Sequence, residues 1–114
     1  MQRIDVATIQ YNDEFAYINI IELKCTEAYN DIIDSQIPWY ITWIKDYIVP
    51  TFRQKVIITP VIISKPFTND DDLASFKDRC SSLYLQDNDS FRIKPVKLIS
   101  YTYDNNSVSF NSEF

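Results

Sequence analysis

A glutamate and a lysine close an otherwise apolar stretch of this chain, which reads Ile18-Asn19-Ile20-Ile21-Glu22-Leu23-Lys24-Cys25. The run of β-branched residues predicts a β-strand, in which successive side chains point to opposite faces. Glu22 and Lys24 therefore share the face of Ile18 and Ile20. A carboxylate and an ammonium in this position form either an ion pair at the rim of a sheet or half of a metal-dependent hydrolytic site.

Two further features make the second interpretation stronger. Asp5 lies on the strand expected before this one, and Gln36 and Tyr40 are spaced one helical turn apart in the helix expected after it. Each residue alone has a simpler interpretation. Asp5 suits a solvated strand position, Gln36 a helix start, and Tyr40 and Trp43 suit a hydrophobic core. Taken together in this order, they favour a site over a surface ion pair.

The composition limits the chemistry of that site. The 114 residues include no histidine and two cysteines, so the chain alone cannot close a tetrahedral zinc site or form a His-based triad. Any metal would be a hard cation held by carboxylates and water, namely Mg²⁺ or Mn²⁺. The absence of glycine excludes glycine-rich phosphate loops. A net charge of −5 counts against coating nucleic acid by bulk electrostatics.

Hydrophobic periodicity predicts one α/β domain over residues 1–114, with a mixed sheet and the element order β-β-α-β-α-β-β. The first two strands should pair as an antiparallel hairpin, with the helices and later strands following. The expected elements are strands at Ile4–Gln10 and Phe15–Lys24, a helix from Asp34 or Ser35 to Pro50, a strand at Lys55–Ser64 buried on both faces, a helix from Asn69 to Leu83, and strands at Arg92–Tyr103 and Ser107–Phe110.

Several local features carry their own expectations. Without glycine, Asn12-Asp13 and Asp104-Asn105-Asn106 should supply the positive φ that tight turns need. Pro60 inside a strand indicates an end, a bulge or an edge position. The acidic run at residues 70–72 complements a helix dipole. Two other groups have plain structural interpretations: the basic strip is a solvated strand face and the thiols are buried (Arg92, Lys94, Lys97; Cys25, Cys80).

At these residues the sequence resembles a known family. "RIDVATIQ", "INIIELKC" and "QIPWY" resemble the core motifs of the PD-(D/E)XK nuclease superfamily, in its RecB-like and NucS-like branch. The resemblance covers about Arg3 to Ser64. It implies a restriction-endonuclease-like fold and a Mg²⁺- or Mn²⁺-dependent enzyme that hydrolyses phosphodiester bonds of DNA, or of RNA.

The resemblance also implies a role for each motif residue. Asp5, Glu22 and the carbonyl of Leu23 would be metal ligands. Lys24 would orient the attacking water and stabilise charge on the phosphate. Gln36 and Tyr40 would border the site, with Gln36 near a helix N-terminus whose dipole faces a phosphate.

Enzymes of this kind usually carry a further helix before the strand that bears the aspartate, whereas this sequence begins at that strand. The expected alternatives are an excised domain, a core completed by a second copy or another subunit, or an inactive nuclease-fold module that binds a protein or nucleic acid. The sequence shows no apolar run of membrane-spanning length and no signal-peptide pattern, so an intracellular, cytoplasmic protein with no membrane contact is expected.

Overall fold

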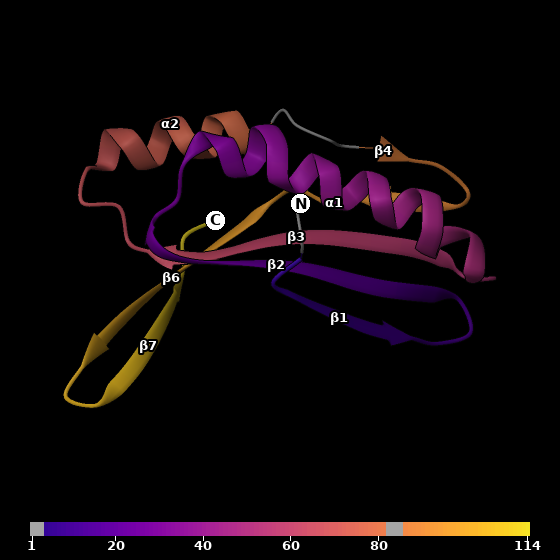
Figure 1. Cartoon of the computed structure of the whole chain (residues 1–114), viewed down its shortest axis with the longest axis horizontal. Coiled ribbons are helices and arrows are strands. Elements are labelled where there is room, and N and C mark those ends of the chain that lie inside the picture. The colour runs from indigo at the N-terminus through magenta and orange to yellow at the C-terminus, as the bar shows by residue number, and fades with distance from the viewer. Residues whose placement is uncertain (1–3, 82–85) are drawn as a thin grey trace.

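The computed structural model describes residues 4–81 and 86–114, so Arg3 and Leu83 lie outside the described residues. The described chain is mixed α/β, as predicted, with a curled mixed sheet and its helices on one face (Figure 1). The strands are β1 (Val6–Tyr11), β2 (Phe15–Glu27), β3 (Lys55–Lys65), β4 (Gln86–Asp87), β5 (Phe91–Ile93), β6 (Lys97–Asp104) and β7 (Ser107–Ser112). The helical segments are η1 (Ile32–Gln36), α1 (Ile37–Trp43), η2 (Ile44–Ile48), η3 (Val49–Thr51) and α2 (Asp70–Ser81).

The strand pairing confirms the predicted N-terminal hairpin. β1 runs antiparallel to β2, and β2 runs parallel to β3, so the helical segment between β2 and β3 is a crossover connection. On its other side, β3 pairs in parallel with β5 and then with β6. β4 and β7 complete antiparallel pairs with β5 and β6 respectively. The strand β4 was not predicted.

Pro60 lies in the middle of β3, the central strand, where its missing N–H costs no ladder hydrogen bond. Val56–Ile58 pair with β5 and Val61–Ser64 pair with β6, so Pro60 falls between the two partners. The N–H of Lys94 donates to the Ile58 carbonyl at 2.8 Å. The backbone N–H and C=O groups of even-numbered residues in this part of β3 therefore point toward β5 and β6, and not toward β2. The position is thus neither an end nor an edge, and β2 pairs with β3 in unbroken register across Pro60. The expectation of an end, a bulge or an edge position was wrong.

A second proline divides the long C-terminal strand that the sequence predicted. The expected strand from Arg92 to Tyr103 is wrong, because β5 ends at Ile93 and β6 begins at Lys97. Pro95 lies in the gap, where a residue without an N–H interrupts the ladder. The break lets two short strands occupy successive stretches of one edge of β3.

The first helical segment begins earlier than predicted. The segment is already helical at Asn30, and a π-turn, η1, runs directly into α1. Gln36 has helical φ and ψ of −73° and −54°, and no side chain caps the segment at Asp34 or Ser35. Gln36 therefore lies inside a continuous helical segment. The expectation that a helix N-terminal dipole stands beside it was wrong, because orphan N–H groups belong to the first turn only.

The turns replace glycine in two different ways. Asn105 and Asn106 adopt φ of 50° and 64° between β6 and β7, as predicted. No described residue near Asn12 has positive φ, so that expectation was wrong. Instead the Asn12 side chain accepts the N–H groups of Glu14 and Phe15, both at 2.8 Å.

The second helix begins as predicted. The Asn69 side chain accepts the N–H groups of Asp71 at 2.8 Å and Asp72 at 3.2 Å, which caps α2. The acidic first turn of α2 follows directly, where negative charge complements the helix dipole.

The hydrophobic core lies between the helices and one face of the sheet. It combines alternate residues of β2 and β3 with the inner faces of the helices, in one cluster: Ala16, Ile18, Ile20, Ala28, Ile32, Ile33, Ile37, Tyr40, Ile41, Ile44, Val49, Val56, Ile58, Ile62, Phe76, Cys80, Ile93, Val96 and Leu98. Trp43 is 40% exposed and Cys25 is exposed, so the expectation that both are buried was wrong. Burial raises the pKa of the Cys80 thiol to about 12.

No described helix, within residues 4–81 and 86–114, combines the length and apolar character needed to cross a bilayer.

Candidate active site

The motif residues come together where β2 leaves the hydrophobic core. Glu22 and Lys24 follow Ile18 and Ile20 on the face of β2 that the helices cover, as the alternation predicted. Tyr40 reaches the same place from α1, and Asp5 lies there directly before β1 begins. The structure therefore assembles two carboxylates, one ammonium and one phenol from three separate segments.

Glu22 is the centre of this cluster and is only 3% exposed. Its Oε1 lies 2.9 Å from the Lys24 Nζ, and its Oε2 accepts the hydroxyl of Tyr40 at 3.1 Å. A buried carboxylate is tolerated when opposite charge and hydrogen bonds compensate for its lost hydration. The pair is thus an interior ion pair and not the surface pair that the sequence allowed.

Asp5 lies at the open edge of β2, directly before β1 begins, so the expectation that the first strand starts at Ile4 and includes Asp5 was wrong. The last register pair of the hairpin is Val6 with Ile21, so Asp5 stands across from Glu22. Asp5 Oδ2 accepts the N–H of Leu23 at 3.0 Å. Because the N–H and C=O of one strand residue point to the same side, the carbonyl of Leu23 also faces this edge.

Gln36 carries a buried side-chain oxygen on the same helical segment as Tyr40. It precedes Tyr40 by four residues, which places both side chains on the same face of the helical segment. Gln36 Oε1 is buried without a hydrogen-bond partner, which is true of no other side-chain nitrogen or oxygen buried in the described parts of the chain. Such an atom is rare in folded proteins and calls for a donor.

Two tyrosines that the sequence analysis did not select hold Lys24 in place. The Lys24 ammonium lies 5.4 Å from the centre of the Tyr29 ring, and the Tyr101 hydroxyl donates to the Lys24 carbonyl at 3.3 Å. Burial lowers the pKa of Lys24, but hydrogen bonds to Glu22 and Tyr29 outweigh burial and raise it above the ordinary value. Lys24 is therefore a fixed cation at neutral pH. Tyr101 comes from 77 residues away, so no local pattern could indicate it.

Tyr40 should ionise at a higher pH than a free tyrosine side chain. Its burial and the negative charge of Glu22 raise its pKa to about 12. Between pH 10 and 12 the unfolded chain releases this proton while the folded protein keeps it, so stability should fall as pH rises. Tyr40→Phe should reduce that fall and leave the tyrosinate absorbance at pH 11 unchanged. A variant that shows one tyrosinate fewer at pH 11 would contradict this assignment.

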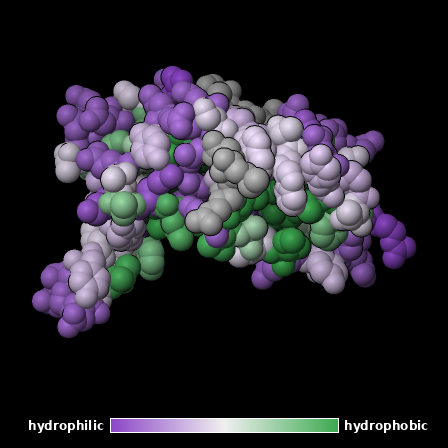
Figure 2. Space-filling view, viewed as in Figure 1, coloured by the Kyte–Doolittle hydropathy of each residue, from purple (hydrophilic) through white to green (hydrophobic). Residues whose placement is uncertain are grey.

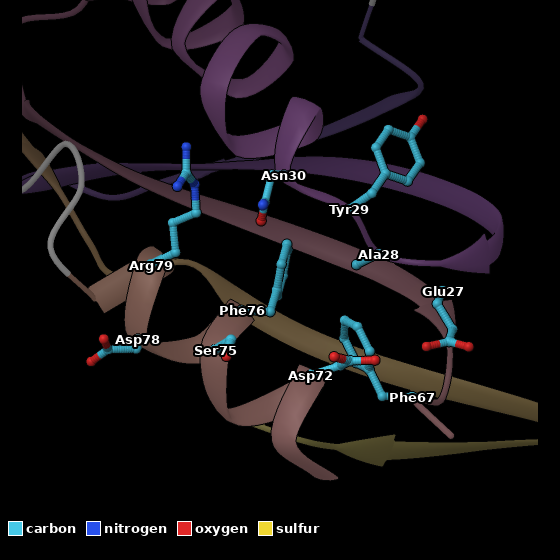
Figure 3. A pocket seen from close by; sticks show the side chains of 10 residues that line it. All are labelled: Glu27, Ala28, Tyr29, Asn30, Phe67, Asp72, Ser75, Phe76, Asp78 and Arg79. Atoms are coloured by element: carbon cyan, nitrogen blue, oxygen red, sulfur yellow. The ribbon is translucent and has the colours of Figure 1, made fainter. Parts of the chain in front are cut away.

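A separate pocket of about 680 Å³ lies beside this cluster, between the connection after β2 and helix α2 (Figure 3). Phe76 stands at its centre, while Tyr29 and Arg79 point outward. Arg79 pairs with Asp34 through two hydrogen bonds, of 3.1 and 2.6 Å. The remaining charged residues of the lining are acidic: Glu27, Asp72 and Asp78. A phosphate backbone would be repelled here, so this pocket does not extend the cluster as a nucleic-acid groove.

The donor set of the cluster suits a hard divalent cation that keeps most of its water. Asp5, Glu22 and the Leu23 carbonyl offer oxygen atoms only, which fits Mg²⁺ bound through one or two carboxylates. Within residues 4–81 and 86–114, no three aspartate, glutamate or cysteine side chains gather closely enough to hold a metal by themselves. A metal at this edge would therefore rely on the backbone carbonyl, water and substrate oxygens.

Comparison of the chain with protein-family models, curated proteins and solved structures found no match.

Proposed function

We propose that the protein is a metal-dependent nuclease that hydrolyses phosphodiester bonds of DNA at the edge formed by Asp5, Glu22 and Lys24. The observation that carries the proposal is the convergence of these three side chains around the Leu23 peptide, although Asp5 precedes Glu22 by 17 residues in the sequence. Aspartate, glutamate and lysine in this arrangement match the chemistry of the hydrolysis, which must place positive charge where negative charge develops.

The proposed roles divide the charge at the site. Asp5, Glu22 and the Leu23 carbonyl hold Mg²⁺ or Mn²⁺, which supplies Lewis acidity toward a phosphate oxygen when bound. Lys24 keeps a fixed positive charge beside Glu22, where it orients water and stabilises the charged phosphate. Tyr40 holds the second oxygen of Glu22, and Gln36 offers its buried acceptor to water or substrate.

The topology supports a restriction-endonuclease-like core for this proposal. That fold places the acidic residues on an antiparallel hairpin whose second strand continues through a helix into a parallel strand. The segment β1–β2–α1–β3 has this order and these directions. The resemblance of the motifs and the order of the elements are independent observations, one from residue identities and one from strand directions.

A second candidate is an inactive module of the same architecture. Both oxygens of Glu22 are already bonded, to Lys24 and to Tyr40, so the cluster satisfies itself without a metal. A buried polar cluster of this kind can fix how α1 packs on the sheet. The two candidates differ in one measurable property, which is whether a divalent cation binds at the Asp5 edge.

Binding of Mn²⁺, followed by electron paramagnetic resonance, separates the candidates. The nuclease proposal expects one Mn²⁺ per chain, and Asp5→Asn should weaken its affinity by at least about tenfold. The matched control is Asp46→Asn, which removes the same charge from an exposed position on η2. Equal Mn²⁺ affinity in the wild type and Asp5→Asn would favour the inactive module.

A further inference from the structure

The face of the sheet opposite the helices carries no helix of the described chain, and its floor is largely apolar (Figure 1). The register places Tyr17 of β2 beside Ile57 of β3, and Ile21 beside Val61, on this face. We call it the open face. Ile57 and Val61 form its floor and are 8% exposed each, although neither belongs to the core cluster under the helices. Its most exposed apolar residues on the β1–β2 side are Val6 (41%), Tyr17 (41%) and Leu23 (48%).

The β6–β7 hairpin extends this apolar surface beyond the body of the protein. Its far half projects away from the helices without contacting another strand (Figure 1). Tyr103 pairs with Val108 and Tyr101 with Phe110, so these apolar residues share one face. The other face carries only small polar and acidic residues: Thr102, Asp104, Ser107, Ser109 and Asn111. A free hairpin with one apolar face is marginally stable in water unless that face is covered.

The uncovered apolar area is large enough for a stable contact. Tyr103, Val108 and Phe110 are 66%, 52% and 61% exposed. With roughly 150–250 Å² for each aromatic side chain, the hairpin residues together with those of the β1–β2 side expose on the order of 500 Å² of apolar surface. A standard interface buries about 800 Å² per partner, of which roughly 60% is apolar. The open face therefore offers about the apolar area that one partner contributes.

Both halves of a reciprocal contact are present on this one surface. The hairpin stands off the body, and hydrophobic residues line the indentation between them (Figure 2). A projecting arm and an indentation on the same molecule allow two copies to exchange arms about a two-fold axis. Arg92 and Lys97 also face the open side, because the register places them beside Ile57 and Val61. The apolar face of the hairpin carries no charge, so a partner's hairpin would bring no like charge to these two cations.

We infer that the protein forms a two-fold homodimer in which the apolar face of each β6–β7 hairpin packs on the open face of the partner. The inference does not depend on the nuclease proposal, because Glu22 and Lys24 lie on the other face of β2. It predicts which substitutions separate the copies and which, on the same hairpin, do not.

Light scattering after size-exclusion chromatography tests the dimer across micromolar concentrations. The wild type should have a mass near 27 kDa, twice the 13.5 kDa of one chain. Phe110→Asp and Tyr17→Asp should each become monomeric, because each buries a charge in one half of the contact. The matched control is Ser109→Asp on the polar face of the hairpin, which should remain dimeric.

Mixing the two monomeric variants identifies the arrangement. Phe110→Asp keeps an intact open face and Tyr17→Asp an intact hairpin, so their mixture should recover dimers through one of the two contacts. A dimer that survives both substitutions would overturn the inference and indicate pairing elsewhere, for example along β1. A wild type of 13.5 kDa at about 100 μM would also overturn it, because a standard-size interface should hold copies together there. If these variants instead lost affinity for a labelled single-stranded oligonucleotide while the wild type was monomeric, the face would bind nucleic acid.

Discussion

Glu22→Gln should abolish Mn²⁺-dependent cleavage of single- and double-stranded DNA, lowering the rate by about three orders of magnitude or more. The substitution keeps the shape of the side chain and its hydrogen bond with Tyr40, but it removes the negative charge that would hold the metal. Circular dichroism should show that the variant retains the folded content of the wild type. The measurement is the initial rate of cleavage in Mn²⁺ for both proteins, prepared in parallel.

Two controls make this result decisive. Glu14→Gln removes the same charge from the exposed turn between β1 and β2 and should cleave at the wild-type rate. Chelation with EDTA should stop cleavage by the wild type, because the carboxylates alone supply no Lewis acid. Cleavage by Glu22→Gln within about twofold of the wild-type rate would refute the assignment of the site.

Lys24→Met should lower the free energy of unfolding by about 2–4 kcal/mol at pH 8. The variant leaves the buried carboxylate of Glu22 with the Tyr40 hydroxyl as its only remaining partner among those described, and a buried charge that has lost its opposite charge is strongly destabilising. The value lies somewhat below the range for fully buried pairs because the Lys24 side chain is 20% exposed. Urea denaturation at fixed ionic strength measures it.

The double variant Glu22→Gln/Lys24→Met separates the ion pair from simple packing. With both charges removed, most of the lost stability should return, because no unpaired charge remains in the interior. A Lys24→Met variant less than about 0.5 kcal/mol from the wild type at pH 8 would show that the pair is energetically a surface pair.

The strands that carry the site could be predicted because their patterns are local. The alternation in Ile18–Lys24 decided that Glu22 and Lys24 share the core face, and the structure confirms it. The β-branched run was also sufficient to predict the strand β3, and Asn69 was sufficient to predict the start of α2. Each of these signals depends on neighbours within a few residues, which is the range over which side-chain alternation and capping act.

The helix start and the strand breaks could not be predicted in the same way. η1 begins without a capping side chain, so no N-cap residue indicates where the helical segment starts. As a result, Gln36 was expected at the start of a helix, whereas it lies inside the segment. Pro60 seemed incompatible with a central strand, yet it lies where β3 exchanges β5 for β6 as its partner. Whether a missing N–H matters depends on the partner strand, and the partner is set by tertiary pairing.

The sequence by itself determined the residue types of the site, their order along the chain, and the exclusion of zinc and glycine-loop chemistry, because these depend only on composition and spacing. Only the tertiary structure decided that Asp5 bonds the Leu23 amide, that Tyr101 holds Lys24, and that both helices cover one face of the sheet. A strand pattern specifies which side chains share a face, but not which element covers that face. The open face could therefore be identified only from the tertiary structure, which shows that the helices cover the other face.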